Sequence, residues 1–172
     1  MANPRSYNVL FLCTGNSARS ILAECILNRD AAGRLRAYSA GSHPKGEVNP
    51  GALRWLVANG FAVEALRSKS WDEFEGDGAP VFDLIITVCD NAAGEVCPIW
   101  PGRPARGHWS LEDPAAVEGS QVEIDRAFAH TAAQLSARIG LLIRLPIARL
   151  NGPTLQQRID EIGRIPDETT PR

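Results

Sequence analysis

The 172-residue sequence has few cysteines, almost no net charge and no long hydrophobic run. Its four cysteines are too few to form a disulfide scaffold, so in a reducing compartment we expect them to be catalytic, ligating or inert. A formal charge of −2, from 18 basic and 20 acidic residues, leaves no broad basic surface for nucleic acid and no polybasic segment for a membrane.

The apolar run at residues 9–13 is far too short for a secretion signal or a membrane-spanning helix, so we expect a cytoplasmic protein. With 44% hydrophobic and 22% charged residues, the chain has the composition of one globular domain that buries a core. We place this domain at residues 1–146 and assign 147–172, where the periodic pattern weakens, to a C-terminal extension that is partly helical and frayed. No sequence feature indicates an obligate partner surface, so a monomer is expected.

Apolar runs alternate with segments of helical spacing along the chain. Strands are predicted at residues 7–13, 35–40, 82–89 and 106–109. Helices are predicted from about residue 22 to 33, from 50 to 60, at 70–73, from a capping box at 120–123 to residue 146, and at 154–162. This alternation predicts an α/β fold with a parallel, doubly wound sheet, in which the strand at 82–89, apolar on both faces, is central.

The strongest chemical signal is CTGNSARS, which runs from Cys13 to Ser20 between the first strand and the first helix. Backbone N–H groups of such a loop, with the positive end of the following helix, hold a tetrahedral oxyanion without a metal, and Arg19 can clamp two of its oxygens. The same field lowers the pKa of Cys13 and makes it a nucleophile, and Ser20 could donate a hydrogen bond to the thiolate. The alternative is a buried cysteine followed by an ordinary turn. The predicted oxyanion-binding residues are Thr14, Gly15, Asn16, Ser17, Ala18, Arg19 and Ser20.

Two further cysteines, Cys89 and Cys97, flank a polar segment after the predicted central strand. Because the carboxyl ends of parallel strands share one edge of the sheet, Cys13, Cys89 and the loop after Trp109 are expected to converge there. A thiol there could attack a sulfur-bound intermediate, and a second thiol could resolve the resulting disulfide. Core thiols, or a zinc site completed by His108, are the alternatives. Cys25, at helical spacing with apolar neighbours, is predicted to be a core residue.

An acidic residue, Asp113, follows the last predicted strand and precedes Pro114, which favours an extended backbone at Asp113. If its carboxyl group overhangs the anion site, it can remain protonated and act as a general acid for a leaving oxygen. A loop carboxylate or a helix cap is an equal alternative, and Glu112 is the rival for the acid role.

Three segments together, CTGNSARS at 13–20, TVCDNAAGEVCP at 87–98 and HWSLEDPA at 108–115, resemble the thioredoxin-coupled arsenate reductases of the low-molecular-weight protein tyrosine phosphatase superfamily. The resemblance covers residues 7–145. It implies a four-stranded parallel sheet flanked by helices, with a phosphate loop between the first strand and first helix. It also implies reduction of arsenate to arsenite without a bound organic cofactor, with phosphate or sulfate as substrate analogues.

The resemblance also implies a role for each matching residue. Cys13 would attack arsenic while Arg19 holds the oxyanion and Asp113 protonates the departing oxygen. Cys89 would then displace arsenite and form a disulfide with Cys13, and Cys97 would attack Cys89 to leave a disulfide that thioredoxin reduces. Some members bind a potassium ion, and the matching positions here are Asn16, Glu24, Ser39 and Asp72.

The sequence departs from this family in three places. Ala18 stands where relatives often have another cysteine, the spacing from Cys89 to Cys97 is one residue longer, and the tail after Pro146 has no counterpart. A tyrosine phosphatase using the same loop is the first alternative function, although Ala115 and Ala116 stand where phosphatases place aromatic residues. A glutaredoxin-coupled reductase and a noncatalytic anion or metal sensor are the others.

Overall fold

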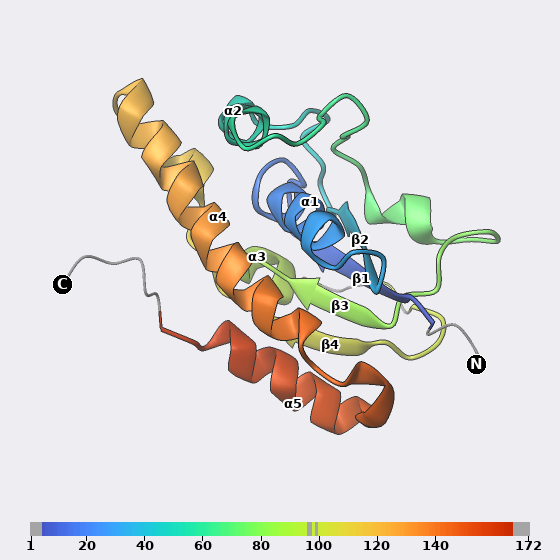
Figure 1. Cartoon of the computed structure of the whole chain (residues 1–172). Coiled ribbons are helices and arrows are strands. Elements are labelled where there is room, and N and C mark those ends of the chain that lie inside the picture. Colours follow the sequence, from blue (N-terminus) through green and yellow to red (C-terminus); the bar gives the residue numbers. More distant parts are fainter. Residues whose placement is uncertain (1–4, 96–97, 99, 167–172) are drawn as a thin grey trace.

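The computed structural model describes residues 5–95, 98 and 100–166, and it contains a four-stranded parallel sheet (Figure 1). The strands are β1 (Tyr7–Leu12), β2 (Leu35–Ala40), β3 (Leu84–Thr87) and β4 (Ala105–His108), arranged in the order β2-β1-β3-β4. Each neighbouring pair is parallel, and β3 is an inner strand, so the predicted fold class is confirmed. β3 is shorter than expected because the chain turns into a helix at Asp90.

Five α-helices and three 3-10 helices connect or follow these strands within the described part of the chain. They are α1 (Arg19–Asp30), α2 (Pro50–Ala58), η1 (Trp71–Phe74), α3 (Asp90–Ala93), η2 (Pro114–Ala116), α4 (Gln121–Ile143), η3 (Ile147–Arg149) and α5 (Gly152–Gly163). The predicted caps form, since Asn49 accepts a hydrogen bond from Gly51 N–H and Ser120 from Glu123 N–H. The short helices α3 and η2 were not predicted, because one turn has too few residues to show periodicity.

The two faces of the sheet carry cores of different size. Alternate β1 residues Val9 and Phe11 face a large core that they share with α1, α4 and α5, whereas Leu10 and Leu12 face a small one closed by Phe82 and Trp100. Because successive side chains of a strand point to opposite faces of the sheet, β1 contributes residues to both cores. The long helix α4 covers the larger core diagonally (Figure 1).

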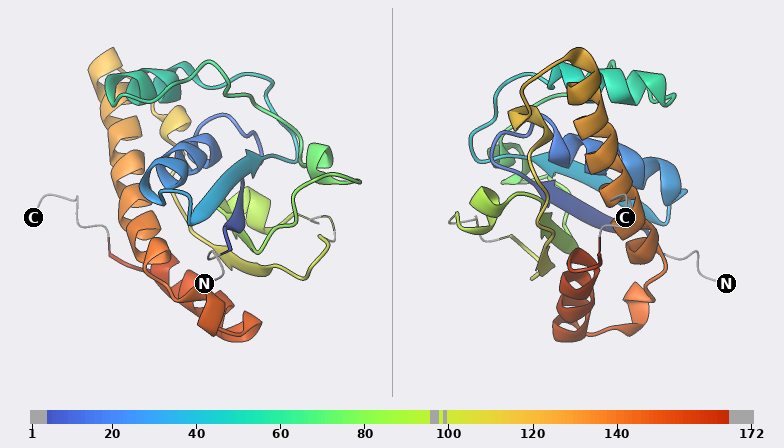
Figure 2. Two further views of the ribbon diagram at one scale, coloured as in Figure 1. Left: turned by 45° about the vertical axis from the view of Figure 1, so that its right-hand side comes forward. Right: turned by 90° about the vertical axis from the view of Figure 1, so that its left-hand side faces the viewer.

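The C-terminal helix α5 lies along β4, the edge strand of the sheet, in both views of Figure 2. Its Ile159 sits where a side chain on Gly107 would be, since a Cβ at Gly107 would lie 2.2 Å from Ile159 Cγ2. Asp160 Oδ1 accepts a hydrogen bond from the backbone N–H of His108 at 3.1 Å, and the Trp109 indole donates to Ile159 O at 3.0 Å. The extension thus covers the open edge of the sheet, where an unpaired strand would otherwise face solvent.

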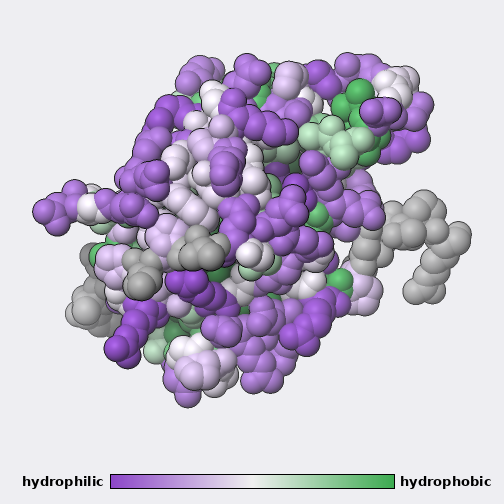
Figure 3. Space-filling model, turned by 180° about the vertical axis from the view of Figure 1, so that it is seen from behind, coloured by the Kyte–Doolittle hydropathy of each residue, from purple (hydrophilic) through white to green (hydrophobic). Residues whose placement is uncertain are grey.

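No helix among the described residues is both long and apolar enough to cross a bilayer. Seen from behind, the surface is mostly hydrophilic, with hydrophobic residues in small separate patches (Figure 3). On this face the molecule therefore has no broad apolar area.

Candidate active site

A cavity of about 230 Å³ opens at the carboxyl ends of the strands, and each of the four loops that follow a strand contributes to it. This is the edge at which open α/β sheets bind ligands. The sequence predicted that Cys13, Cys89 and the loop carrying Asp113 would meet there, and the structure brings all three to the cavity. The lining residues are Cys13, Thr14, Gly15, Ser17, Ala18, Arg19, His43, Lys45, Cys89, Asn91 and Asp113.

The loop between β1 and α1 is held in shape by a buried asparagine. Asn16 has a φ of 41°, in the left-handed region that asparagine tolerates, and its side chain has no exposure to solvent. Its amide donates to Ser20 Oγ at 2.8 Å and accepts from Lys69 N–H at 2.8 Å. Gly41 closes the loop from outside, because a Cβ there would lie 2.4 Å from Thr14 O. Asn16 and Ser20 therefore shape the loop from below, whereas the other predicted oxyanion-binding residues line the cavity.

Arg19 and Asp113 face each other across the cavity. One guanidinium nitrogen of Arg19 donates to Leu111 O at 2.9 Å, and the other lies 3.7 Å from Asp113 Oδ2. The other carboxylate oxygen of Asp113 accepts from Ala115 N–H at 3.0 Å and caps η2. Asp113 thus forms the helix cap and also lines the cavity, and its role as a general acid stays a prediction. Glu112 is exposed and does not line the cavity, so the structure favours Asp113 over its rival.

Cys13 and Cys89 are both buried and form a thiol pair at the floor of the cavity. The hydrogen bond between them, with burial, raises the pKa of Cys13. The same hydrogen bond lowers the pKa of Cys89 to about 5, helped by backbone N–H groups of Thr14 and Ala92. Thr14 N–H points at Cys89 Sγ from 3.3 Å. The pair therefore keeps one proton and carries one negative charge at neutral pH, whereas the sequence placed the thiolate on Cys13 alone.

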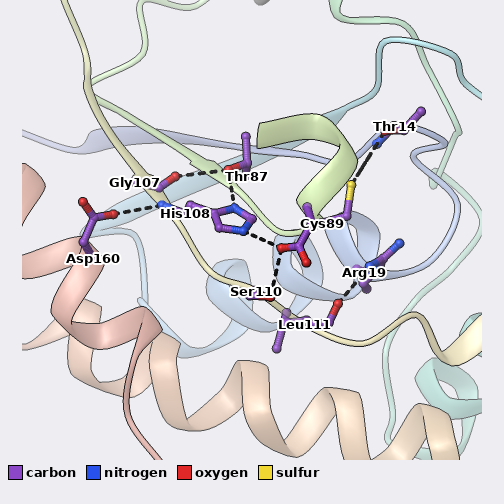
Figure 4. A network of polar contacts seen from close by, with 10 residues as sticks. Thr14, Arg19, Thr87, Cys89, Gly107, His108, Ser110, Leu111 and Asp160 are labelled. Carbon is purple, nitrogen blue, oxygen red and sulfur yellow. Dashed lines mark hydrogen bonds and ion pairs between the residues drawn. The ribbon is translucent and has the colours of Figure 1, made fainter. Parts of the chain in front are cut away.

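A network of hydrogen bonds next to Cys89, which the sequence analysis did not predict, is shown in Figure 4. The ring of His108 bridges Thr87 Oγ1, at 2.7 Å, and Asp90 Oδ1, at 2.8 Å. Ser110 donates to the same Asp90 oxygen at 2.9 Å. These contacts lower the pKa of Asp90 and fix the first residue of α3, directly after Cys89. The position of His108 at the end of a predicted strand was the one sign of this network in the sequence. Its hydrogen-bond partners, Thr87 and Asp90, could be identified only from the fold.

Of the two remaining cysteines, Cys25 lies among the described residues and Cys97 does not. Cys25 is buried, and burial raises its pKa to about 12, as expected for a core thiol. Cys97 lies outside the described residues, so its predicted role stays a prediction. Within the described ranges no group of three or more histidine, cysteine or acidic side chains could hold a metal ion. Both ring nitrogens of His108 are engaged by Thr87 and Asp90, which disfavours it as a zinc ligand.

Only part of the set predicted for potassium comes together. Ser39 Oγ donates to Glu24 Oε1 at 2.8 Å, but the Asn16 oxygen is taken by Lys69 N–H and Asp72 is exposed on η1. Burial raises the pKa of Glu24, and the nearby Lys69 cation opposes that shift. A cation of the chain itself thus already faces this carboxylate, and the four positions do not fit a potassium site well.

The fold and the Cys13–Ser20 loop define a class of protein: a phosphatase-like α/β domain with a cysteine at the base of an oxyanion loop. The model of the family described as low molecular weight phosphotyrosine protein phosphatase matches residues 8–152. The chain belongs to this family. The match ends at the start of α5, so most of that helix lies beyond it.

Within the family, the chain is similar to arsenate reductases. An arsenate reductase of Halalkalibacterium halodurans is 35% identical over 131 residues, which cover 76% of this chain and 91% of the relative. The structure of a Corynebacterium glutamicum thioredoxin-dependent arsenate reductase aligns with a TM-score of 0.54 and 28% identity, covering 83% of this chain and 65% of that chain. A low molecular weight protein tyrosine phosphatase from T. tengcongensis aligns with a TM-score of 0.63 and 25% identity, covering 80% and 97% of the two chains.

Proposed function

We propose that this protein is an arsenate reductase that works by a three-cysteine relay. The observation that carries the proposal is a second thiol, Cys89, at the floor of the cavity. It is hydrogen-bonded to the Cys13 thiol and to the backbone N–H of Thr14. Phosphoester hydrolysis needs no such thiol, whereas reduction of an oxyanion held on Cys13 requires one within reach. The arsenate reductases among its relatives support the same substrate.

In the first step, the proton of the thiol pair moves from Cys13 to Cys89, and Cys13 as thiolate attacks arsenic while the loop amides and Arg19 hold the arsenate oxygens. One oxygen leaves as water with a proton from Asp113, whose carboxyl group faces Arg19 across the cavity. The product is an arsenic(V) group bonded to Cys13 Sγ.

In the second step, Cys89 passes this proton to an oxygen of the arsenic group and, as thiolate, attacks Cys13 Sγ. The sulfur–arsenic bond breaks, its electron pair stays on arsenic, and arsenite leaves as arsenic(III). Cys13 and Cys89 are thereby oxidised to a disulfide. Cys97 then attacks Cys89 Sγ and releases Cys13 as thiolate, and the dithiol of thioredoxin reduces the Cys89–Cys97 disulfide.

Thioredoxin is proposed as reductant because the cycle ends with a disulfide between two protein thiols. The similar C. glutamicum reductase is described as thioredoxin-dependent, which supports this choice. Glutaredoxin with glutathione is the alternative. We further propose that the protein acts as a monomer.

A protein tyrosine phosphatase is the second candidate function, favoured by the similarity to the T. tengcongensis enzyme and by the shared Cys13, Arg19 and Asp113. The cavity lining argues against it as the main activity. A phosphotyrosine ring stacks on aromatic side chains, but among the described residues that line the cavity none is Phe, Tyr or Trp. We expect at most a weak phosphatase side activity.

The direct test is arsenate-dependent oxidation of NADPH by the purified protein with thioredoxin and thioredoxin reductase, beside a control without arsenate. Sustained oxidation is expected. No oxidation, with the donor system shown to be active on another disulfide, would contradict thioredoxin coupling. Adding glutathione and glutaredoxin, or an aryl phosphate, then separates the two alternatives.

A further inference from the structure

The charges already identified around the cavity do not favour a doubly charged oxyanion. Arg19 is the one cation identified there so far, and the thiol pair holds one negative charge. Glu95 adds another nearby, since it accepts a hydrogen bond from Thr14 Oγ1 at 2.6 Å. Without a further cation, an arsenate dianion would enter a site in which the charge of the thiol pair already offsets the one arginine.

The segment after β2 brings such a cation to the cavity. His43 N–H donates to Thr14 O at 2.9 Å and Lys45 N–H donates to Gly15 O at 3.0 Å, so the segment is bonded to the oxyanion loop along its backbone. The Lys45 side chain lies over Gly15, because a Cβ at Gly15 would be 3.2 Å from Lys45 Cε. Both His43 and Lys45 line the cavity.

Two features separate Lys45 from an ordinary surface lysine. It forms no ion pair with any described residue, so its charge is not neutralised by an acidic side chain in that part of the chain. Its backbone is also fixed to the loop whose amides would bind the anion. A tethered, unpaired ammonium loses little freedom when it meets a charged oxygen.

We infer that Lys45 is a second oxyanion-binding cation, which acts with Arg19 and sets the affinity of the site for tetrahedral dianions. The ammonium contacts an oxygen at the mouth of the cavity, while Arg19 and the loop amides hold those at its floor. The inference deepens the proposed function and rests on it for the identity of arsenate as the dianion. Binding of phosphate or sulfate at this site tests it independently.

The experiment measures inorganic phosphate and sulfate binding to the wild-type chain and to Lys45→Met, Lys45→Arg and Arg149→Met by calorimetry. Steady-state arsenate reduction is measured in parallel. Lys45→Met is expected to raise both dissociation constants and the arsenate KM roughly tenfold, the size of one charge-assisted hydrogen bond, with kcat within about twofold. Lys45→Arg is expected to retain affinity. Arg149→Met removes an exposed charge far from the cavity and is expected to change neither quantity.

Each outcome has a distinct meaning. Unchanged phosphate and sulfate binding in Lys45→Met would overturn the inference, as would an equal loss in Arg149→Met, because the effect would then come from net charge alone. If Lys45→Met weakens anion binding but the wild type reduces no arsenate with any thiol donor, the inference about Lys45 stands and the proposed reductase function fails.

Discussion

The two sulfur atoms at the base of the cavity come from regions built in different ways. The region of Cys13 is one continuous segment that runs from the end of β1 to Ser20 in the first turn of α1, and backbone N–H groups of the segment after β2, such as that of Lys69, bind it from outside. The region of Cys89 depends on His108 in β4, which is itself bonded to Asp160 in α5. The comparison teaches that the residues of the predicted oxyanion loop are adjacent in the chain, whereas the second thiol and the residues that position it come together only from distant segments.

The sharpest way to separate the two regions is Cys89→Ser. We expect multiple turnover with arsenate to fall by at least about a thousandfold, because arsenic stays bonded to Cys13 when no thiolate displaces it. Any aryl phosphatase activity should persist, since the Cys13 region remains intact. Cys25→Ser, in a buried thiol outside the cavity, is the matched control and should keep wild-type turnover in the thioredoxin-coupled assay. Full turnover in Cys89→Ser would refute the relay.

The dependence of Cys89 on the Cys13 region can be measured as the pKa of the Cys89 thiol. Cys89 has a pKa of about 5, with the hydrogen bond from Cys13 as the largest cause. At pH 7 it should therefore be a thiolate, and in Cys13→Ala its pKa should rise toward the ordinary value of about 8.5. Ultraviolet absorbance of the thiolate across a pH titration measures this, with Cys97→Ser and Cys25→Ser backgrounds removing the other thiols. An unchanged midpoint would show that Thr14 and Ala92 alone stabilise the charge.

The proposed general acid, which faces Arg19, is tested by Asp113→Asn. The amide preserves the cap on Ala115 but cannot supply the proton, so kcat should fall roughly a hundredfold. Glu112→Gln, one residue earlier and exposed, should stay within about twofold. Reduction rates at saturating arsenate distinguish the two variants, and equal losses would mean that the acid has been assigned to the wrong residue.

The support behind the second region is tested by Ile159→Ala in α5. Ile159 is fully buried against Gly107, so removing its side chain should lower the free energy of unfolding by about 3 kcal/mol. Val122→Ala, at an exposed position of α4, should change it by less than about 0.5 kcal/mol. Denaturant titration gives both values. Similar small losses would show that α5 is not integral to the domain.

The smallest effect is expected at the link between α5 and β4. Asp160→Ala leaves the backbone N–H of His108 without its acceptor, which should cost about 1 kcal/mol of stability. Glu161→Ala, at the next and exposed position, is the control and should have almost no effect. If Asp160→Ala also slows arsenate turnover while binding phosphate normally, the network helps to position Cys89; unchanged turnover would limit Asp160 to a structural role.

Much of the fold could be predicted because it follows from local patterns. The apolar runs that became β1 and β3, and the caps at Asn49 and Ser120, are set by neighbouring residues. The helix α3 and the η2 turn could not be predicted, because they are single turns fixed by what surrounds them. The tail was predicted as partly helical, and its packing on β4 emerged only in the structure.

The sequence by itself determined the oxyanion loop, since a cysteine, an arginine six residues later and the helix that follows are adjacent in the chain. Tertiary structure alone decided which acid reaches the cavity, in which direction the pKa of each of the two thiols shifts, and that Lys45 lines the cavity. These properties depend on distances and burial between segments far apart in the chain. Only packing sets those distances, because the pKa and charge of a side chain respond to its neighbours in space.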